Sequence, residues 1–402
     1  MNNTIKLAVA SALLAAASSA SAAGGIVAGD WTLDIGGVVN AYYTSTKVSG
    51  DSVNSTGTNT ASNITTGLLP NYLAVSGKTR QNDLDVAFTI SINPGASTQN
   101  SGNQGAHQEN RQAFLTFGDA SWGSFKLGKD LGIYASDAIL NDMTLLGVGH
   151  SAGALAGNTT TLGSIGAGYM YADWKSQVAY TSPNFNGFQF TAGVTQAFDV
   201  DTAGTIPASV GGAVRGGKEP AFEGKASYAF AADQVNGKVW VSGISQNLEA
   251  YNTTGSAWDL GATVSAAGFG LTGYYGEGKG TGMTVQFAGA VDADGVKQDS
   301  KDWYLQATYT LPGVGTKLGA RYGESELDQN QSRLVSDAGK QKREMWAFGV
   351  YHPITKHLNL VAEYVEAKNT NSSSNDDDNS GPEFGPTSGK AKTISLGAIL
   401  FF

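Results

Sequence analysis

The stretch from Asp30 to Thr44, with the sequence DWTLDIGGVVNAYYT, alternates apolar and polar side chains with a period of two. Consecutive side chains of a β-strand point to opposite faces, so this period predicts a strand with one apolar and one polar face. The apolar face would carry Trp31, Leu33, Ile35, Val39, Ala41 and Tyr43, and the polar face Thr32, Asp34, Asn40, Tyr42 and Thr44. The stretch therefore predicts a strand that separates two different environments.

The same alternation recurs along the chain, most clearly in residues 84–92, 258–265, 303–310 and 358–364. It predicts sixteen strands, which start near residues 30, 70, 84, 111, 122, 174, 187, 221, 237, 256, 269, 302, 315, 343, 357 and 390. Each predicted strand has about the length that a tilted strand needs to cross the hydrocarbon core of a membrane.

The connections between these strands alternate between short and long. The short ones contain turn-forming residues and include 81–83, 118–121, 183–184, 267–268, 312–313 and 353–354. The long ones are rich in Gly, Ser, Thr, Asn and Asp and cover about 45–69, 94–110, 130–173, 197–220, 278–301, 325–342 and 368–389. Short periplasmic turns and long extracellular loops are typical of an outer-membrane β-barrel.

Backbone groups in hydrocarbon must all be paired, so lipid-facing strands have to close into a barrel without a free edge. With sixteen strands, the lumen is too wide to be filled by side chains of the wall, and a water-filled channel follows. We therefore predict an all-β fold, a 16-stranded antiparallel transmembrane β-barrel.

The composition excludes several other classes of function. Among 402 residues there is no cysteine, so disulfides and thiolate metal sites are impossible, and the net charge of −9 argues against nucleic acid as a partner. The four histidines, at positions 107, 150, 352 and 357, lack metal-ligand spacing, and there is no G-x-S-x-G motif. We expect no metal, no cofactor and no enzymatic activity.

Residues 1–22 have the features of a secretory signal peptide. Lys6 precedes an apolar stretch, and Ala20, Ser21 and Ala22 offer a small-residue cleavage site. The apolar stretch is too short for a transmembrane helix. We expect an exported mature chain of residues 23–402.

Three segments resemble the Gram-negative trimeric porins: RQAFLTFG (111–118) followed by WGSFKLGK (122–129), and VAYTSPNFNGF (178–188). The C-terminus alternates and ends in Phe402, similar to the signal read by the barrel-assembly machinery. The resemblance implies a homotrimer in outer-membrane lipid and lipopolysaccharide. It also implies a third loop, about 130–173, folded into the barrel, and passive diffusion of small hydrophilic solutes and ions.

The resemblance and the strand parity together give the candidate residues of a pore constriction. Of the basic wall positions of enteric relatives, aligned here with Val38, Tyr72, Lys129 and Thr181, only Lys129 keeps its charge, while Asp137 and Asp142 match acidic loop positions. Parity places these charges inward: Lys126, Lys175, Lys225, Arg321, Arg343, Asp34, Asp85, Glu223, Asp259 and Glu363. The candidates are Asp137, Asp142, Lys126, Lys129 and Arg321. The inward charges are balanced, so they do not decide between cation and anion selectivity.

Alternative functions remain open on the sequence alone. A substrate-selective channel of the same fold could use inward tyrosines to bind sugars, and these are Tyr42, Tyr72, Tyr274, Tyr304 and Tyr351. A barrel with long loops could instead serve adhesion or surface structure, and a soluble secreted β-protein is the remaining alternative. Asp292 and Asp294, with Asp299 and Asp302, resemble part of a calcium loop but lack its full spacing and its terminal glutamate. The acidic run 376–378 is either a solvated loop tip or a site for divalent ions that bridge to lipopolysaccharide.

Overall fold

The computed structural model describes residues 25–51, 59–97, 108–151, 160–198, 219–292, 294–330, 338–372 and 387–402. The described strands are β1 (Ile26–Ala28), β2 (Trp31–Gly50), β3 (Thr60–Thr65), β4 (Tyr72–Gln81), β5 (Leu84–Pro94), β6 (Gln108–Glu109), β7 (Ala113–Asp119), β8 (Gly123–Leu131), β9 (Trp174–Thr181), β10 (Phe188–Thr195), β11 (Ala221–Ala232), β12 (Val235–Leu248), β13 (Thr253–Ala266), β14 (Phe269–Lys279), β15 (Asp299–Thr310), β16 (Lys317–Gln329), β17 (Gly339–Pro353), β18 (Leu358–Asn371) and β19 (Thr387–Phe401). The helical segments are α2 (Ser136–Leu140), η1 (Met143–Leu146) and η2 (Glu249–Tyr251).

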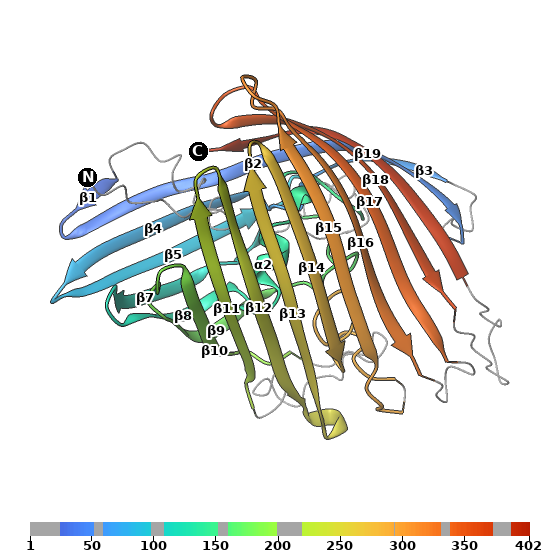
Figure 1. Cartoon of the computed structure of the whole chain (residues 1–402), viewed down its shortest axis with the longest axis horizontal. Helices are drawn as coiled ribbons and strands as arrows, with labels where there is room; N and C mark the ends of the chain where they lie inside the picture. Colours follow the sequence, from blue (N-terminus) through green and yellow to red (C-terminus); the bar gives the residue numbers. More distant parts are fainter. Residues whose placement is uncertain are drawn as a thin grey trace.

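The strands form a closed antiparallel barrel (Figure 1). The short strands β1, β3 and β6 add to edges already in the ring, because β3 and β4 both pair with β2, β6 and β7 both pair with β5, and β1 pairs with the start of β2. The other sixteen pair in chain order, and β19 returns to pair with β2. The predicted 16-stranded barrel is confirmed.

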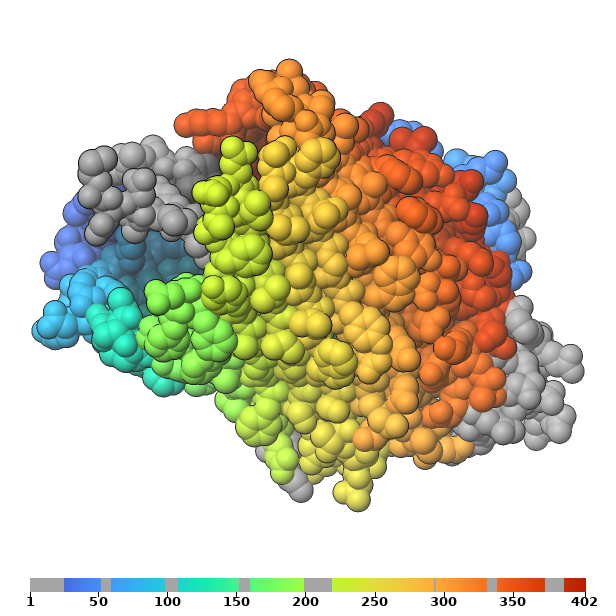
Figure 2. Space-filling model, viewed as in Figure 1, coloured from blue at the N-terminus to red at the C-terminus, as the bar shows by residue number. Residues whose placement is uncertain are grey.

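The alternation seen in the sequence separates the two faces of the wall. In β2, Val39, Ala41 and Tyr43 are exposed, whereas Asn40 and Tyr42 are buried. The outer surface is apolar around the ring, and Figure 2 shows the outer side of the strands from β11 to β19 as one unbroken wall. Apolar side chains on the outside of a closed barrel are those that contact lipid.

Aromatic side chains form contacts near both ends of the outer face. Toward the long loops, Trp303 lies 5.3 Å from Tyr322, which lies 4.6 Å from Trp346, measured between ring centroids. Near the short turns, Phe269 lies 4.3 Å from Tyr309. Amphipathic rings settle at membrane interfaces, so these contacts fit the two girdles expected of a membrane barrel.

The turns at one end are tight. Asn82 and Asp83, and likewise Ala267 with Gly268, have positive φ, which allows a two-residue reversal between strands. The strand ends that border the longer connections lie at the other end of the barrel (Figure 1). Within the described ranges, no helix combines the length and the hydropathy needed to cross a membrane.

Candidate functional site

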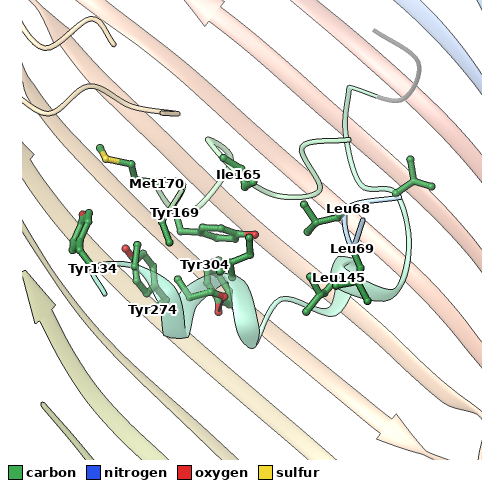
Figure 3. Packing of buried hydrophobic residues seen from close by; sticks show 14 of the residues in the cluster. Leu68, Leu69, Tyr134, Leu145, Ile165, Tyr169, Met170, Tyr274 and Tyr304 are labelled. Atoms are coloured by element: carbon green, nitrogen blue, oxygen red, sulfur yellow. Dashed lines mark hydrogen bonds between the residues drawn. The ribbon is translucent and has the colours of Figure 1, made fainter. Parts of the chain in front are cut away.

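In the third long connection, between β8 and β9, the described residues 132–151 and 160–173 fold into the lumen and pack against the wall. It contains α2 and η1, and its apolar side chains are buried together with inward-facing residues of the strands. Figure 3 shows Tyr134, Tyr169, Tyr274 and Tyr304 gathered near α2. Leu68 and Leu69, which come from the connection between β3 and β4, lie with Leu145 near η1. Burial of these apolar groups favours the inward position of the loop.

The wall carboxylate Glu223 of β11 binds the start of this third loop. It accepts hydrogen bonds from the backbone N–H groups of Ile133 (2.7 Å) and Tyr134 (2.8 Å), and from Lys175 Nζ (2.6 Å) and Thr195 Oγ1 (2.8 Å). The side chains of Glu223 and Lys175 are both fully buried. Four donors satisfy one buried carboxylate, so this charge is used to position the loop.

A second wall carboxylate, Glu363 of β18, binds the loop farther along. It accepts hydrogen bonds from the backbone N–H groups of Val148 (2.7 Å) and Gly149 (3.1 Å) and from Tyr351 OH (2.7 Å). A Cβ atom at Gly147 would lie 2.2 Å from Glu363 Oε1, so a residue without a side chain is needed for this close approach.

Neutral wall side chains bind the loop between these two carboxylates. Gln306 accepts from Met143 N (2.7 Å) and donates to Asn141 O (2.9 Å). Tyr304 OH donates to Ala138 O (3.0 Å), and Tyr42 OH donates to Leu146 O (2.7 Å). From Ile133 to Gly149 the loop is therefore bound to the inner face of the barrel.

Asp142 and Arg321, both predicted as constriction residues, lie together. Asp142 Oδ1 is 3.7 Å from Arg321 Nε, and both side chains are fully buried. Asp142 also accepts from Thr144 N (3.0 Å) and Tyr169 OH (2.7 Å), and the Arg321 guanidinium lies 4.4 Å from the centroid of the Tyr304 ring. The loop acid thus contacts the wall base directly.

Asp137, the other predicted loop acid, contacts two wall lysines. Lys225 Nζ lies 2.9 Å from Asp137 Oδ2, and Lys238 Nζ pairs with Oδ1. Although burial by itself raises it, the two ammonium groups lower the pKa of Asp137 below its usual value. The lysine side chains are 21% and 18% exposed and the carboxylate only 1%, so the solvent-facing part of this cluster is positive.

Lys238 was missed in the sequence although its signal was present. It has the same parity as the inward Ser242 and the opposite parity to the outward Val239 and Val241. Trp240 is a large aromatic residue that is buried on the same inward face, and its presence made the polar face of β12 hard to recognise.

The two remaining candidates, Lys126 and Lys129, point to opposite sides of β8. Lys126 pairs with Asp130 and lies 4.9 Å from the centroid of the Phe114 ring. Lys129 is directly opposite Ala113, which belongs to the exposed face, and its Nζ donates to Asn110 O (2.8 Å). The register therefore places Lys129 on the outward face, and the alignment that selected it conflicts with the alternation of its own strand.

The inward tyrosines do not form a free binding track. Tyr42 and Tyr304 donate to the third loop, Tyr351 donates to Glu363, and Tyr274 stacks with Tyr304 at 5.5 Å. Tyr72 is buried in the same apolar cluster. The rings therefore pack the loop, and nothing in their arrangement favours a sugar site.

His150 is buried inside the third loop. Its Nε2 lies 2.7 Å from Ile165 O and therefore carries the proton, and its Nδ1 lies 2.8 Å from Ser151 Oγ. Burial, with added repulsion from Arg343 and Arg321, lowers the pKa of His150 from 6.5 to about 3. The ring is neutral at ordinary pH and serves to position the loop.

Other predicted features lie away from this site. Asp292 accepts from Asp294 N (2.8 Å) and Val296 N (2.9 Å), as expected for a loop turn. Residues 1–22, His107 and the acidic run 376–378 lie outside the described residues.

A closed, lipid-facing barrel with a loop bound inside its lumen defines the porin class of channel. The sequence profile described as Gram-negative porin matches residues 8–372, and the chain therefore belongs to the Gram-negative porin family, whose members lie in the outer membrane.

Individual relatives agree with this assignment. The outer membrane porin OmpD of Salmonella typhimurium is 30% identical over 112 residues, which are 27% of this chain and 30% of OmpD. Among solved structures, the anion-selective porin from Comamonas acidovorans has a TM-score of 0.60 at 15% identity. The match covers 92% of this chain and 100% of that porin chain. The outer membrane channel DcaP of Acinetobacter baumannii has a TM-score of 0.60 at 14% identity and covers 93% of this chain and 99% of its own. These structures share the fold.

Proposed function

We propose that this chain forms a water-filled channel for the passive diffusion of small hydrophilic solutes and ions across the outer membrane. The observation that carries the proposal is the third loop. It is bound by Glu223 and Glu363 inside a barrel whose outer face is apolar. A loop fixed in this way narrows a lumen without changing the wall, which is what a size-limited diffusion channel requires.

The proposal is tested by the conductance of the purified protein in planar lipid bilayers. We expect stable open channels, a current that is linear in voltage, and no saturation by small sugars. Absence of conductance from correctly folded protein would favour the adhesion or surface-structure alternative. Saturating block by a single solute would favour the substrate-selective alternative.

The assembly and export of the chain belong to the same proposal. A homotrimer is supported by the family and by the trimer form reported for OmpT of Vibrio cholerae, a structure of the same fold. Closure of the channel in three equal voltage-induced steps would support it. Cleavage after residue 22, and recognition of Phe402 by the barrel-assembly machinery, are tested by N-terminal sequencing of the mature protein and by deletion of Phe402.

For the constriction we propose Asp137, Asp142, Lys126 and Arg321, extended by Lys225 and Lys238, and we leave out the outward-facing Lys129. The exposed atoms of the Asp137 cluster belong to its two lysines, and Asp142 is fully buried. Arg321 is fully buried as well, so the water-facing charge comes from the Asp137 cluster. It is positive, which favours anions in transit.

The ion preference is tested by the reversal potential in a salt gradient. Lys225→Gln and Lys238→Gln should each shift it toward cations, and Asp137→Asn should shift it toward anions. The matched control is Lys342→Gln, a lysine of the outer face that should leave the reversal potential unchanged. Equal values for wild type and all three inner variants would remove this cluster from the ion path.

A further inference from the structure

Two buried carboxyl groups on the inner face of the barrel have no basic partner. Asp259 of β13 is 0% exposed and Asp302 of β15 is 3% exposed. In the part of the chain that the structure describes, neither forms an ion pair with a lysine, an arginine or a histidine. An ionised carboxylate in a protein interior is unfavourable without a compensating charge. The two groups therefore need either a bound cation or a proton.

The two acids lie on either side of a glycine. Gly276 of β14 is directly opposite Asp259 in one neighbouring strand and directly opposite Asp302 in the other. Gly278, two residues farther along β14, is on the same inner face and is directly opposite Ser300. Two successive inward positions of the strand between the acids therefore carry no side chain.

Each carboxyl group has one oxygen that is poorly hydrogen-bonded. Asp259 Oδ1 accepts from Ser242 N (3.0 Å) and Ser242 Oγ (2.7 Å), whereas Oδ2 accepts only from Tyr274 OH, at 3.5 Å. Asp302 Oδ1 accepts from Ser325 Oγ, and no hydrogen bond from a described residue reaches Oδ2. One oxygen of each acid is therefore available as a ligand.

Two buried hydroxyl groups beside the acids also lack partners among the described residues, and they are Thr281 Oγ1 and Ser300 Oγ. Thr281 is 0% exposed and Ser300 is 3% exposed. Both point at the space over Gly278, because a Cβ atom there would lie 2.0 Å from Thr281 Oγ1 and 2.7 Å from Ser300 Oγ. A buried hydroxyl group without a partner is unfavourable, and an ion bound by its oxygen removes that cost.

Two tyrosine hydroxyl groups lie at the same place. A Cβ atom at Gly276 would lie 2.9 Å from Tyr274 OH, so this hydroxyl lies over the glycine between the acids. Tyr134 of the third loop forms a hydrogen bond with Tyr274 and is within electrostatic range of both carboxyl groups (Figure 3). An ion bound here would lie between the wall and the start of the third loop.

We propose that Asp259 and Asp302 bind one calcium ion, with Ser300 Oγ, Thr281 Oγ1 and Tyr274 OH as further oxygen ligands. Two carboxylates neutralise a divalent ion. Ca²⁺ takes about 6–8 oxygen ligands in a flexible geometry, whereas Mg²⁺ demands a near-ideal octahedron, so an irregular set from three strands and a loop suits Ca²⁺ better. The site goes beyond the channel function and does not depend on it.

The test is native mass spectrometry of the full-length protein, refolded in detergent without lipopolysaccharide, treated with a chelator and then titrated with Ca²⁺ alone. We expect one Ca²⁺ per chain and weaker binding of Mg²⁺. Loss of an outer partner of a metal ligand costs about 10–100-fold in affinity, so Asp259→Asn and Asp302→Asn should each raise the dissociation constant at least about 100-fold. The matched control is Asp299→Asn, an exposed acid on the outer face of β15, which should bind Ca²⁺ like wild type.

A second measurement uses Tb³⁺, which occupies calcium sites and emits light when a nearby tyrosine transfers energy to it. Tb³⁺ emission excited through tyrosine should saturate at one ion per chain, fall when Ca²⁺ is added and be lost in both inner variants. Heat-modifiable migration in gels checks that each variant is folded. A wild-type chain that binds neither ion would overturn the proposal and would mean that the two acids hold a proton. Equal affinity in wild type, Asp259→Asn and Asp302→Asn would also overturn it. Conductance is recorded separately, so a channel that conducts without binding Ca²⁺ would refute this site and leave the channel function intact.

Discussion

The inner and outer faces of β16 to β18 carry the same kinds of charge in two different settings. Inside, Arg321 and Glu363 are buried and contact the third loop. Outside, on the opposite face of these strands, Lys342 and Glu366 form pairs that remain in contact with solvent. A strand alternates its faces, so a single sequence can position a loop in the lumen and match a polar headgroup region outside.

The largest effect is expected where a buried charge loses its partner. Asp142→Ala would leave the Arg321 guanidinium without its carboxylate, and breaking a buried pair in this way costs about 3–5 kcal/mol. We expect a matching loss in the free energy of unfolding, measured in urea with the protein in lipid vesicles.

The double variant Asp142→Leu with Arg321→Leu is the control for this prediction. It removes both charges and should cost less than Asp142→Ala alone. If the Asp142→Ala variant unfolds at the same urea concentration as the wild type, the buried pair does not contribute more to stability than the exposed pairs do.

The next effect concerns the binding of the third loop. Glu363→Gln removes the charge that accepts hydrogen bonds from Val148 N and Gly149 N, and bonds to a charged group contribute about 1.5–3 kcal/mol. We expect more frequent spontaneous closures in single-channel recordings, because the loop would be less firmly bound.

The matched control lies on the same strand with the opposite parity. Glu366→Gln removes a charge from the outer face and should leave single-channel noise unchanged. Increased closures in both variants would mean that β18 responds to any loss of charge, whichever face carries it.

The barrel could be predicted from the sequence, whereas the contacts of the loop could not. The period of two is a local property, and every predicted strand start lies within four residues of the observed one. Parity also placed Lys175, Lys225 and Glu223 inward as observed. The pairing of Asp142 with Arg321 joins residues far apart in sequence, and no local pattern contains that information.

The candidate site shows the same limit. Lys129 was selected by alignment, but it lies on the outward face. A match of residue type between two sequences does not determine which face of a strand a residue occupies. The inward tyrosines were correctly placed, but their hydroxyl groups bind the loop. Which part of the wall a loop covers depends on tertiary packing.

An effect that appears only on acidification is expected from His150. Its pKa is about 3 in the folded protein and about 6.5 when unfolded, so between these values the unfolded state binds the extra proton. Stability should therefore fall as the pH is lowered through this window, by up to about 1.4 kcal/mol per pH unit. The measurement is the difference in unfolding free energy between wild type and His150→Asn as a function of pH.

The variant is needed because many carboxylates titrate in the same window. His150→Asn cannot take up the proton, so its curve contains their contribution without that of the histidine. Parallel curves for the two proteins would show that His150 is protonated in the folded loop and that its surroundings are more polar than the packing indicates.

The smallest effect is expected on the outer face. Lys342 Nζ contacts Glu324 at 2.7 Å, but this pair lies at the protein surface, and exposed pairs contribute about 0.2–1 kcal/mol. Lys342→Gln should therefore change the unfolding free energy by less than about 1 kcal/mol, and less still at high salt because mobile ions screen the pair. A loss above about 2 kcal/mol would mean that this part of the outer face is shielded from water by lipid or by another subunit. The difference between inner charges that position the loop and outer charges that are exposed to solvent would then not hold for β17.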